Sequence, residues 1–155
     1  MILIIKICHF GHLSGKELMA ICTMKRVLIV EDDLSLGWLL KKILDNKYEV
    51  VIKNSGEEAL LWLSVQPFPD LIISDIKMPG MNGVALLEYL SNSALYRNIP
   101  VIIISGFDDP CMRKRCLDLG ALTYLVKPFE PQKLLNEMDR PTLWNQKRRA
   151  KNFGT

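Results

Sequence analysis

The sequence predicts an α/β protein built on a doubly wound, parallel (βα)5 five-stranded sheet. From Met24 onward, short apolar runs alternate five times with stretches whose apolar residues recur at helical spacing. Nearly every predicted strand is a continuous apolar run, as parallel strands covered on both faces require. Right-handed crossovers then place helices on both sides of the sheet. Four of the runs end directly at a polar residue, at the sheet edge where open α/β sheets bind ligands.

The first two strands are expected over Arg26–Val30 and Tyr48–Lys53, and the second of them is rich in β-branched residues. Leucines and an isoleucine recur at helical spacing after the first strand. Asp33, the third acid of its run, is interpreted as the boundary of this helix and not as a metal ligand. Ser55 and Glu58 form a capping box, which opens the second helix.

The remaining strands are short apolar runs over Leu71–Ser74, Val101–Ile104 and Tyr124–Val126. A helix follows each of them. Pro110 and Pro131 begin the last two helices, because the φ angle of proline is preset for a first turn. A glycine at position 120 stops the first of these, and a proline at position 141 should break the second. The last helix is therefore expected to be short.

Length and composition indicate one globular domain with extensions. The chain has 155 residues, of which 49% are hydrophobic and 24% charged. These fractions are ordinary for a soluble globule and exclude a disordered chain. Residues 24–138 are expected to form the domain, residues 1–23 an N-terminal extension outside its core, and residues 139–155 a short basic tail. Met24 resembles a natural chain start, which supports the first boundary.

Charge and cysteine content exclude several other classes of protein. The net charge of +3 resides mostly in the tail, so direct nucleic-acid binding is not expected. No apolar run approaches the length of a membrane span, and the apolar start lacks the basic leader of a signal peptide, so a cytoplasmic location is expected. The four cysteines form no CxxC pair and are interpreted as free thiols. The spacing of Cys8, His9, His12 and Cys22 matches no standard zinc finger.

Glu31, Asp32, Asp75, Ser105 and Lys127 are expected to meet at one edge of the sheet. Three carboxylates so close together raise one another's pKa unless a cation lies among them. An all-oxygen site with few protein ligands suits Mg²⁺. The lysine adds a compact positive charge, and the serine a hydroxyl that can hydrogen-bond an anion. Together these groups indicate phosphoryl transfer to an aspartate.

Four motifs, in this order, resemble the receiver domain of two-component response regulators. They are Val30-Glu31-Asp32, Ser74-Asp75-Ile76-Lys77-Met78-Pro79-Gly80-Met81-Asn82-Gly83, Ser105-Gly106 and Lys127-Pro128-Phe129. The resemblance covers about residues 24–138, and it is specific because the four motifs fall at the ends of four predicted strands. It implies a flavodoxin-like sheet with the strand order 2-1-3-4-5.

The resemblance also implies a role for each acidic residue. Asp75 matches the phosphoacceptor, which takes a phosphoryl group from the phosphohistidine of a kinase. Asp32 matches the direct Mg²⁺ ligand, and Glu31 the neighbouring acid that reaches the metal through water. The backbone carbonyl of Lys77 would complete the protein ligands, with its side chain facing solvent.

The remaining site residues match the groups that respond to phosphorylation. Lys127 matches the lysine that pairs with the phosphoryl group, and Ser105 the hydroxyl that closes on it afterwards. Tyr124 occupies the aromatic switch position, although a role as a plain core aromatic stays open. The peptide bond before Pro128 is expected to be cis. Gly106 stands where a small residue is expected, so the pocket should stay open to the phosphoryl group.

The partners that the resemblance implies are a sensor histidine kinase or a histidine phosphotransfer protein, and a downstream protein target. The chain is expected to be a phosphoacceptor that signals by a conformational switch, and not a turnover enzyme. It would act as a single-domain response regulator. The alternative is the receiver portion of a transcriptional regulator whose DNA-binding domain is missing, since the residues after position 141 are too few for such a domain.

Overall fold

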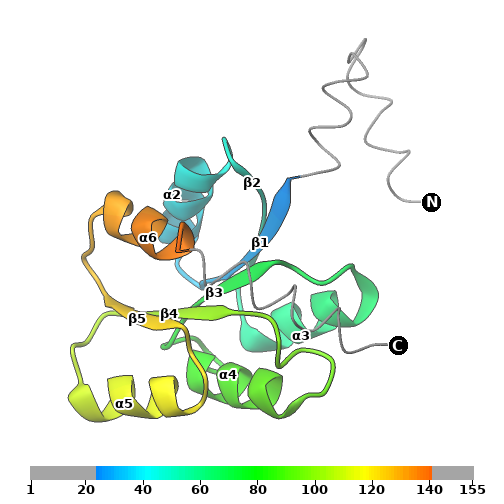
Figure 1. Cartoon of the computed structure of the whole chain (residues 1–155), viewed down its shortest axis with the longest axis vertical. Coiled ribbons are helices and arrows are strands. Elements are labelled where there is room, and N and C mark those ends of the chain that lie inside the picture. The colour runs from blue at the N-terminus through cyan, green and yellow to red at the C-terminus, as the bar shows by residue number, and fades with distance from the viewer. Residues whose placement is uncertain (1–23, 141–155) are drawn as a thin grey trace.

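The computed structural model describes residues 24–140, which form a three-layer α/β fold (Figure 1). Its elements are, in order, β1 (Lys25–Val30), α2 (Leu34–Leu44), β2 (Tyr48–Lys53), α3 (Gly56–Val65), β3 (Leu71–Asp75), α4 (Gly83–Asn92), β4 (Val101–Ser105), α5 (Pro110–Asp118), β5 (Thr123–Val126) and α6 (Pro131–Met138). The strands pair in parallel in the order β2-β1-β3-β4-β5. The predicted doubly wound (βα)5 fold and its strand order are confirmed.

Helices cover both faces of the sheet, with α2 and α6 on one side and α3, α4 and α5 on the other (Figure 1). Side chains alternate along β1 between two cores. Leu28 and Val30 pack in the cluster beneath α3 and α4, and Val27 and Ile29 pack in the cluster beneath α2 and α6. All four side chains are fully buried. This two-sided burial explains why the strand is a continuous apolar run in the sequence.

The edge strand β2 departs from this pattern. Only Tyr48 of its residues is buried, and the other five are half-buried. β2 pairs with β1 alone, so it receives cover from fewer neighbours than the central strands do.

The helices begin at the residues that the sequence predicted. The side chain of Asp33 accepts hydrogen bonds from the backbone N–H groups of the first turn of α2. The hydroxyl of Ser55 accepts from the N–H of Glu58, as a capping box requires. The second half of the box differs from the expectation, because the Glu58 carboxylate accepts from the N–H of Asn54 and not from that of Ser55.

The carboxyl ends of the last two helices also follow the prediction. Gly120 follows α5 with φ of +97°, a left-handed conformation that suits glycine. α6 has eight residues and ends at Met138, so the expected short last helix is confirmed. The proline at position 141 lies outside the described residues, as do the N-terminal extension with its cysteines and histidines and most of the basic tail. Cys111 and Cys116 are free, as predicted. Between residues 24 and 140, no helix is both long and apolar enough to cross a membrane.

Candidate functional site

The site lies at the carboxyl edge of the sheet, where β3 and β4 each run one residue farther than predicted. Asp75 and Ser105 are the last residues of these strands, and Asp75 pairs with Ile104 on the neighbouring strand. Both side chains are buried, with Asp75 only 4% exposed. The backbone of α4 comes very close to this point. A Cβ added to Gly83 would overlap the carbonyl oxygen of Asp75.

The three predicted acids do meet. Glu31, Asp32 and Asp75 each offer a carboxylate oxygen, and these oxygens all lie within 4.8 Å of one another. Glu31 and Asp75 are buried, whereas Asp32 is exposed and faces the solvent side of the cluster. Asp33, the next residue along the chain, caps α2 and is not part of the cluster. The distinction between ligand and cap that the sequence suggested therefore agrees with the geometry.

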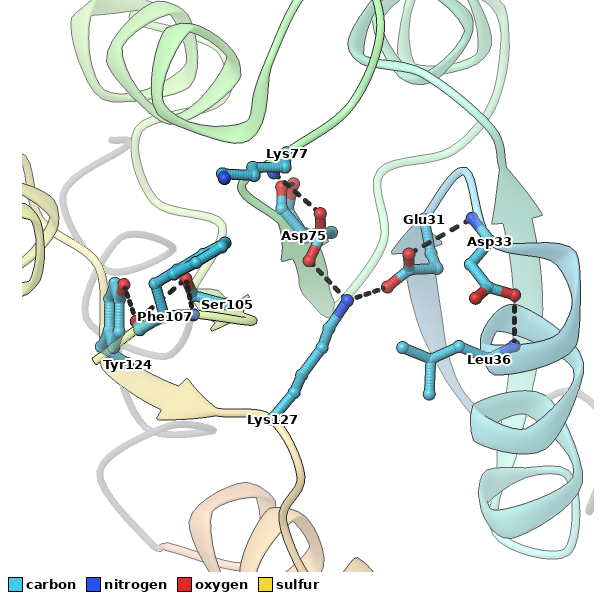
Figure 2. A network of polar contacts seen from close by, with 10 residues as sticks. Glu31, Asp33, Leu36, Asp75, Lys77, Ser105, Phe107, Tyr124 and Lys127 are labelled. Atoms are coloured by element: carbon cyan, nitrogen blue, oxygen red, sulfur yellow. Dashed lines mark hydrogen bonds and ion pairs between the residues drawn. The ribbon is translucent and has the colours of Figure 1, made fainter. Parts of the chain in front are cut away.

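Lys127 bridges the two buried acids (Figure 2). Its Nζ lies 2.5 Å from Oδ1 of Asp75 and 2.9 Å from Oε2 of Glu31. The second oxygen of Asp75, Oδ2, accepts a hydrogen bond of 2.7 Å from the backbone N–H of Lys77. Both oxygens of Asp75 are thus held in place by donors from different loops. The peptide bond between Lys127 and Pro128 is cis, as expected.

Burial and charge shift the pKa values of this buried pair. Burial raises the pKa of Glu31. The hydrogen bond from Lys127 lowers this pKa in part, and the negative charge of Asp75 raises it further. Burial disfavours the charged form of Lys127, but its hydrogen bonds to Asp75 and Glu31 outweigh burial and raise the pKa of the amine. Lys127 is therefore held as an ammonium. With all three acids ionised, one ammonium among three carboxylates leaves a net charge of −2.

This arrangement is compatible with a small divalent cation. The cluster supplies carboxylate oxygens, which are hard ligands, and its net negative charge favours a cation. In an octahedral Mg²⁺ site with bonds of about 2.1 Å, ligand oxygens lie roughly 3–4.2 Å apart. A spread of 4.8 Å or less needs only a small adjustment to meet this geometry. The exposed Asp32 leaves one side of the cluster open to water, which Mg²⁺ retains.

Ser105 and Tyr124 converge on the backbone of Phe107 (Figure 2). The Ser105 hydroxyl donates to the Phe107 carbonyl at 3.2 Å and accepts from the Phe107 N–H at 3.1 Å. The hydroxyl of Tyr124 donates to the same carbonyl at 3.0 Å, and its ring is buried. The two predicted switch residues are thus connected through one peptide group. The alternative that Tyr124 is only a core aromatic is weakened, since its hydroxyl has a specific partner in this loop.

Phe107 was missed by the sequence reasoning. Phe107 is 56% exposed, and the Nζ of Lys77 lies 3.7 Å from the centroid of its ring. The Lys77 side chain is exposed, as predicted, but it rests on this ring and does not simply extend into water. A large apolar residue in the otherwise polar stretch Ser105–Asp109 was the signal available in the sequence.

A groove of about 350 Å³ opens beside Ser105. Its lining combines apolar and charged side chains: Ile76, Lys77, Ser105, Phe107, Asp108, Asp109, Met112 and Tyr124. Asp109 caps α5 through the N–H groups of Cys111 and Met112, and Asp108 pairs with Arg113 at 2.7 Å. Neither acid belongs to the carboxylate cluster. A Cβ added to Gly106 would meet no heavy atom within 4 Å, so there is free space beside this residue, and access of a phosphoryl group through it stays a prediction.

Comparisons with known proteins agree with this geometry. Two curated relatives are the two-component response regulator ORR3 of Oryza sativa subsp. indica, 37% identical over 106 residues, and the uncharacterized transcriptional regulatory protein YbdJ of Bacillus subtilis (strain 168), 40% identical over 114 residues. These matches cover 68% and 73% of this chain, and 81% and 48% of the relatives. The chain spans only 15% of another relative, the two-component response regulator-like PRR37 of Oryza sativa.

The chain is also similar to a solved structure and to a family of known domains. The signal receiver domain of a signal transduction histidine kinase from Syntrophus aciditrophicus is 36% identical, with a TM-score of 0.70; the match covers 78% of this chain and 90% of that domain. The response regulator receiver domain family matches residues 27–139. This is a family of signalling domains, and the match includes all the acids of the cluster together with Ser105 and Lys127. The chain therefore belongs to the response regulator receiver domain family of two-component signalling.

Proposed function

We propose that Asp75 is the phosphoacceptor of this receiver domain and that it takes a phosphoryl group from the phosphohistidine of a sensor histidine kinase or histidine phosphotransfer protein. The observation that carries this proposal is the placement of Asp75. Its buried carboxylate touches the Lys127 ammonium and shares a cluster with two further acids. A carboxylate held between fixed donors is oriented for attack before the phosphoryl donor arrives.

In the proposed reaction, a carboxylate oxygen of Asp75 attacks phosphorus while the bond from phosphorus to the histidine nitrogen breaks. The electron pair of that bond returns to the imidazole, and an acyl phosphate forms on Asp75. Glu31, Asp32, Asp75 and the carbonyl of Lys77 would hold Mg²⁺, which would supply positive charge beside the transferring group. Lys127 supplies a second positive charge, because its ammonium is already in contact with Asp75. The chain acts as a stoichiometric acceptor and not as a turnover enzyme.

The signal would leave the site through Ser105 and Tyr124. A phosphoryl group on Asp75 adds charge and acceptor oxygens next to β4. The Ser105 hydroxyl, now bonded to Phe107, can turn toward those oxygens. Because Tyr124 bonds to the same Phe107 carbonyl, a shift of this peptide changes the surface around the groove. A downstream protein would read that change.

The test is phosphorylation by a small phosphodonor with Mg²⁺, followed by intact-mass measurement. The wild-type chain should gain one phosphoryl group, and Asp75→Asn should gain none. Asp45→Asn serves as a matched control, because Asp45 is an exposed acid at the far end of α2, about 18 Å along the helix from Asp33 beside the cluster. Lys127→Ala should accept phosphate slowly and fail to transmit the change to Tyr124. The adduct should be labile to hydroxylamine, as an acyl phosphate is. An adduct that persists in Asp75→Asn would place the phosphate on another residue.

Two arrangements of the output are compatible with this chemistry. We propose a single-domain response regulator that acts on a protein target in the cytoplasm. The match to ORR3 supports this arrangement, because it covers 81% of that relative. The alternative is a receiver joined to a DNA-binding domain, which the 48% coverage of YbdJ favours. Reading the genomic sequence downstream of Thr155 separates the two, because a DNA-binding domain would follow in the same frame.

A further inference from the structure

A second surface of the molecule carries apolar side chains that the proposed phosphoryl transfer does not use. Ten large hydrophobic residues are exposed among residues 24–140, and half of them lie on α3, on α4 or in the loops that follow these helices. These five residues, which we call the α3–α4 face, are Leu61, Val65, Phe68, Tyr89 and Leu95. Leu61 and Val65 are 69% and 68% exposed and lie one turn apart on the side of α3 that points away from the sheet.

Aromatic contacts join the two helices into one surface. The ring of Phe68, in the loop after α3, meets the ring of Tyr96 edge-on, with 5.3 Å between the centroids. Tyr89 of α4 lies 6.4 Å from the same ring. α3 and α4 lie next to each other on the same side of the sheet (Figure 1). Exposed apolar side chains that gather on one surface can mark a docking site.

The charges on this surface are mostly negative. α3 and α4 contain Glu57, Glu58 and Glu88, and neither helix contains a lysine, arginine or histidine. Three cations border the surface. Arg26 donates a hydrogen bond of 3.3 Å to the Pro67 carbonyl, next to Phe68, and pairs with Glu49 at 2.9 Å. Arg97 follows α4, and Arg115 of α5 lies 3.8 Å from Glu88, in a largely exposed pair that contributes little. A second copy of this face would add further acidic residues without adding lysines, whereas a basic segment complements the glutamates, so a basic occupant is favoured over a second copy.

The chain itself contains a segment with the complementary chemistry. Leu143-Trp144 is an apolar pair, and Lys147-Arg148-Arg149-Ala150-Lys151 follows it. We propose that residues 141–151 dock on the α3–α4 face, with Trp144 against Val65, Phe68 and Tyr89 and with the basic run toward Glu57 and Glu58. The proposal does not depend on phosphorylation of Asp75.

The order of residues supports this orientation. In a βα unit the helix runs back toward the amino edge of the sheet, so Val65 and Phe68 lie at that edge, as does the end of α6 at Met138. Glu57 and Glu58 lie at the opposite end of α3, about 10 Å farther along at 1.5 Å per residue. Because α6 packs on the other side of the sheet, the segment that leaves it must first cross the amino edge, and it then meets the apolar part of the face before the acidic part. Its own sequence has the same order, and the six residues from Met138 to Trp144 can span roughly 20 Å when extended.

Such docking has a consequence for the phosphoacceptor loop. Oε1 of Glu57 accepts a hydrogen bond of 2.6 Å from the N–H of Met81, in the loop between Asp75 and α4. The hydrogen bond from its own backbone N–H, followed by the bond from Met81, lowers the pKa of Glu57 and favours its ionised form. A basic segment beside Glu57 would compete for this carboxylate. The docked segment and the loop after Asp75 are therefore coupled through one side chain.

The test uses the full chain labelled with 5-fluorotryptophan and observed by ¹⁹F NMR. Trp38, which is 65% exposed, provides the reference for a solvent-facing ring. Substitution of each tryptophan by phenylalanine assigns the signals. A soluble gadolinium chelate should relax the Trp144 signal at least about threefold less than the Trp38 signal, because docking covers most of the Trp144 ring. The double variant Leu61→Lys, Val65→Lys should raise the relaxation of Trp144 to the level of Trp38.

Matched variants show whether the α3–α4 face and the basic run of the same chain protect Trp144. Leu117→Lys, which adds a lysine at an exposed leucine on the adjoining α5, should leave Trp144 protected. Charge reversal of Lys147, Arg148 and Arg149 to glutamate should expose Trp144 without any change to the α3–α4 face. The proposal is overturned if Trp144 is as accessible as Trp38 in the wild type, or if protection survives both sets of substitutions. Protection that increases with protein concentration would also overturn it, because a second chain would then supply the segment.

Discussion

The close approach of α4 to the phosphoacceptor can be tested with one methyl group. A Cβ at Gly83 would overlap the carbonyl oxygen of Asp75 and lie 2.9 Å from its carbonyl carbon and 3.0 Å from Cα of Ile76. These are backbone atoms of a buried strand and the residue after it, so no side-chain rotation can relieve the overlap. Overpacking of a core costs about 1–3 kcal/mol, and the gain from replacing a helical glycine by alanine is about 0.5–1 kcal/mol. Because the overlap is with backbone atoms, the cost should lie near the upper end of this range, and after the gain is subtracted we expect Gly83→Ala to lower the free energy of unfolding by about 2 kcal/mol.

Thermal unfolding followed by circular dichroism measures this loss. For a domain of this size, about 2 kcal/mol corresponds to a decrease in Tm of roughly 6–12 °C. Gly106→Ala is the matched control, because its Cβ would meet no heavy atom within 4 Å and should change stability by less than about 0.5 kcal/mol. Gly83→Ala should also slow phosphorylation by a small phosphodonor by roughly tenfold or more, since it displaces Asp75. If the two variants melt together, α4 does not approach Asp75 as described.

Three further predictions concern the metal, the lysine and the N-terminal residues. MgCl₂ at about ten times its Kd should stabilise the wild-type chain by about 1.4 kcal/mol, and Asp32→Ala should lose this stabilisation; equal stabilisation of both in thermal melts would contradict the metal assignment. The pKa of Lys127 is raised on folding, so its contribution to stability is complete below its ordinary pKa of 10.5 and is lost as the pH rises through the raised value. Urea denaturation of wild type and Lys127→Met should therefore differ more at about pH 8 than at strongly alkaline pH, and a constant difference would exclude the ion pair. Removal of residues 1–23 should leave a cooperative melt with little change in Tm, because the five βα units are complete without them; a large loss would show that these residues pack on the core.

The fold was predictable because its signals are local. Continuous apolar runs and helical periodicity follow directly from two-sided burial, and the caps at Asp33 and Ser55 are determined within one turn. The exact ends of β3 and β4 were not predictable, because Asp75 and Ser105 join the sheet by pairing with neighbouring strands. The edge position of β2 explains its half-buried residues, and only the pairing order reveals that position.

The acidic cluster could be predicted from strand ends alone, because parallel strands bring their carboxyl ends to one edge. Lys127 was expected at the same edge, but its bridge to Glu31 could not be predicted, because that contact depends on the rotamers of both side chains. The same holds for Phe107. Its backbone carbonyl accepts from Tyr124 and its ring lies beneath Lys77. The sequence predicts neither contact, because it shows only an apolar residue among polar ones.

The Phe107 carbonyl offers a route by which the proposed phosphorylation of Asp75 would alter the neighbouring groove. Ser105 and Tyr124 both donate to this oxygen, at 3.2 and 3.0 Å. A neutral hydrogen bond of this kind contributes about 1 kcal/mol, whereas one to a charged group contributes about 1.5–3 kcal/mol. In the proposed phosphorylated form, Ser105 therefore gains by exchanging the carbonyl for a phosphoryl oxygen. Tyr124 then remains as the donor to a peptide that has lost its other hydroxyl partner and is free to shift. The Lys77 side chain lies against the ring of the same residue, so that shift also changes the wall of the groove.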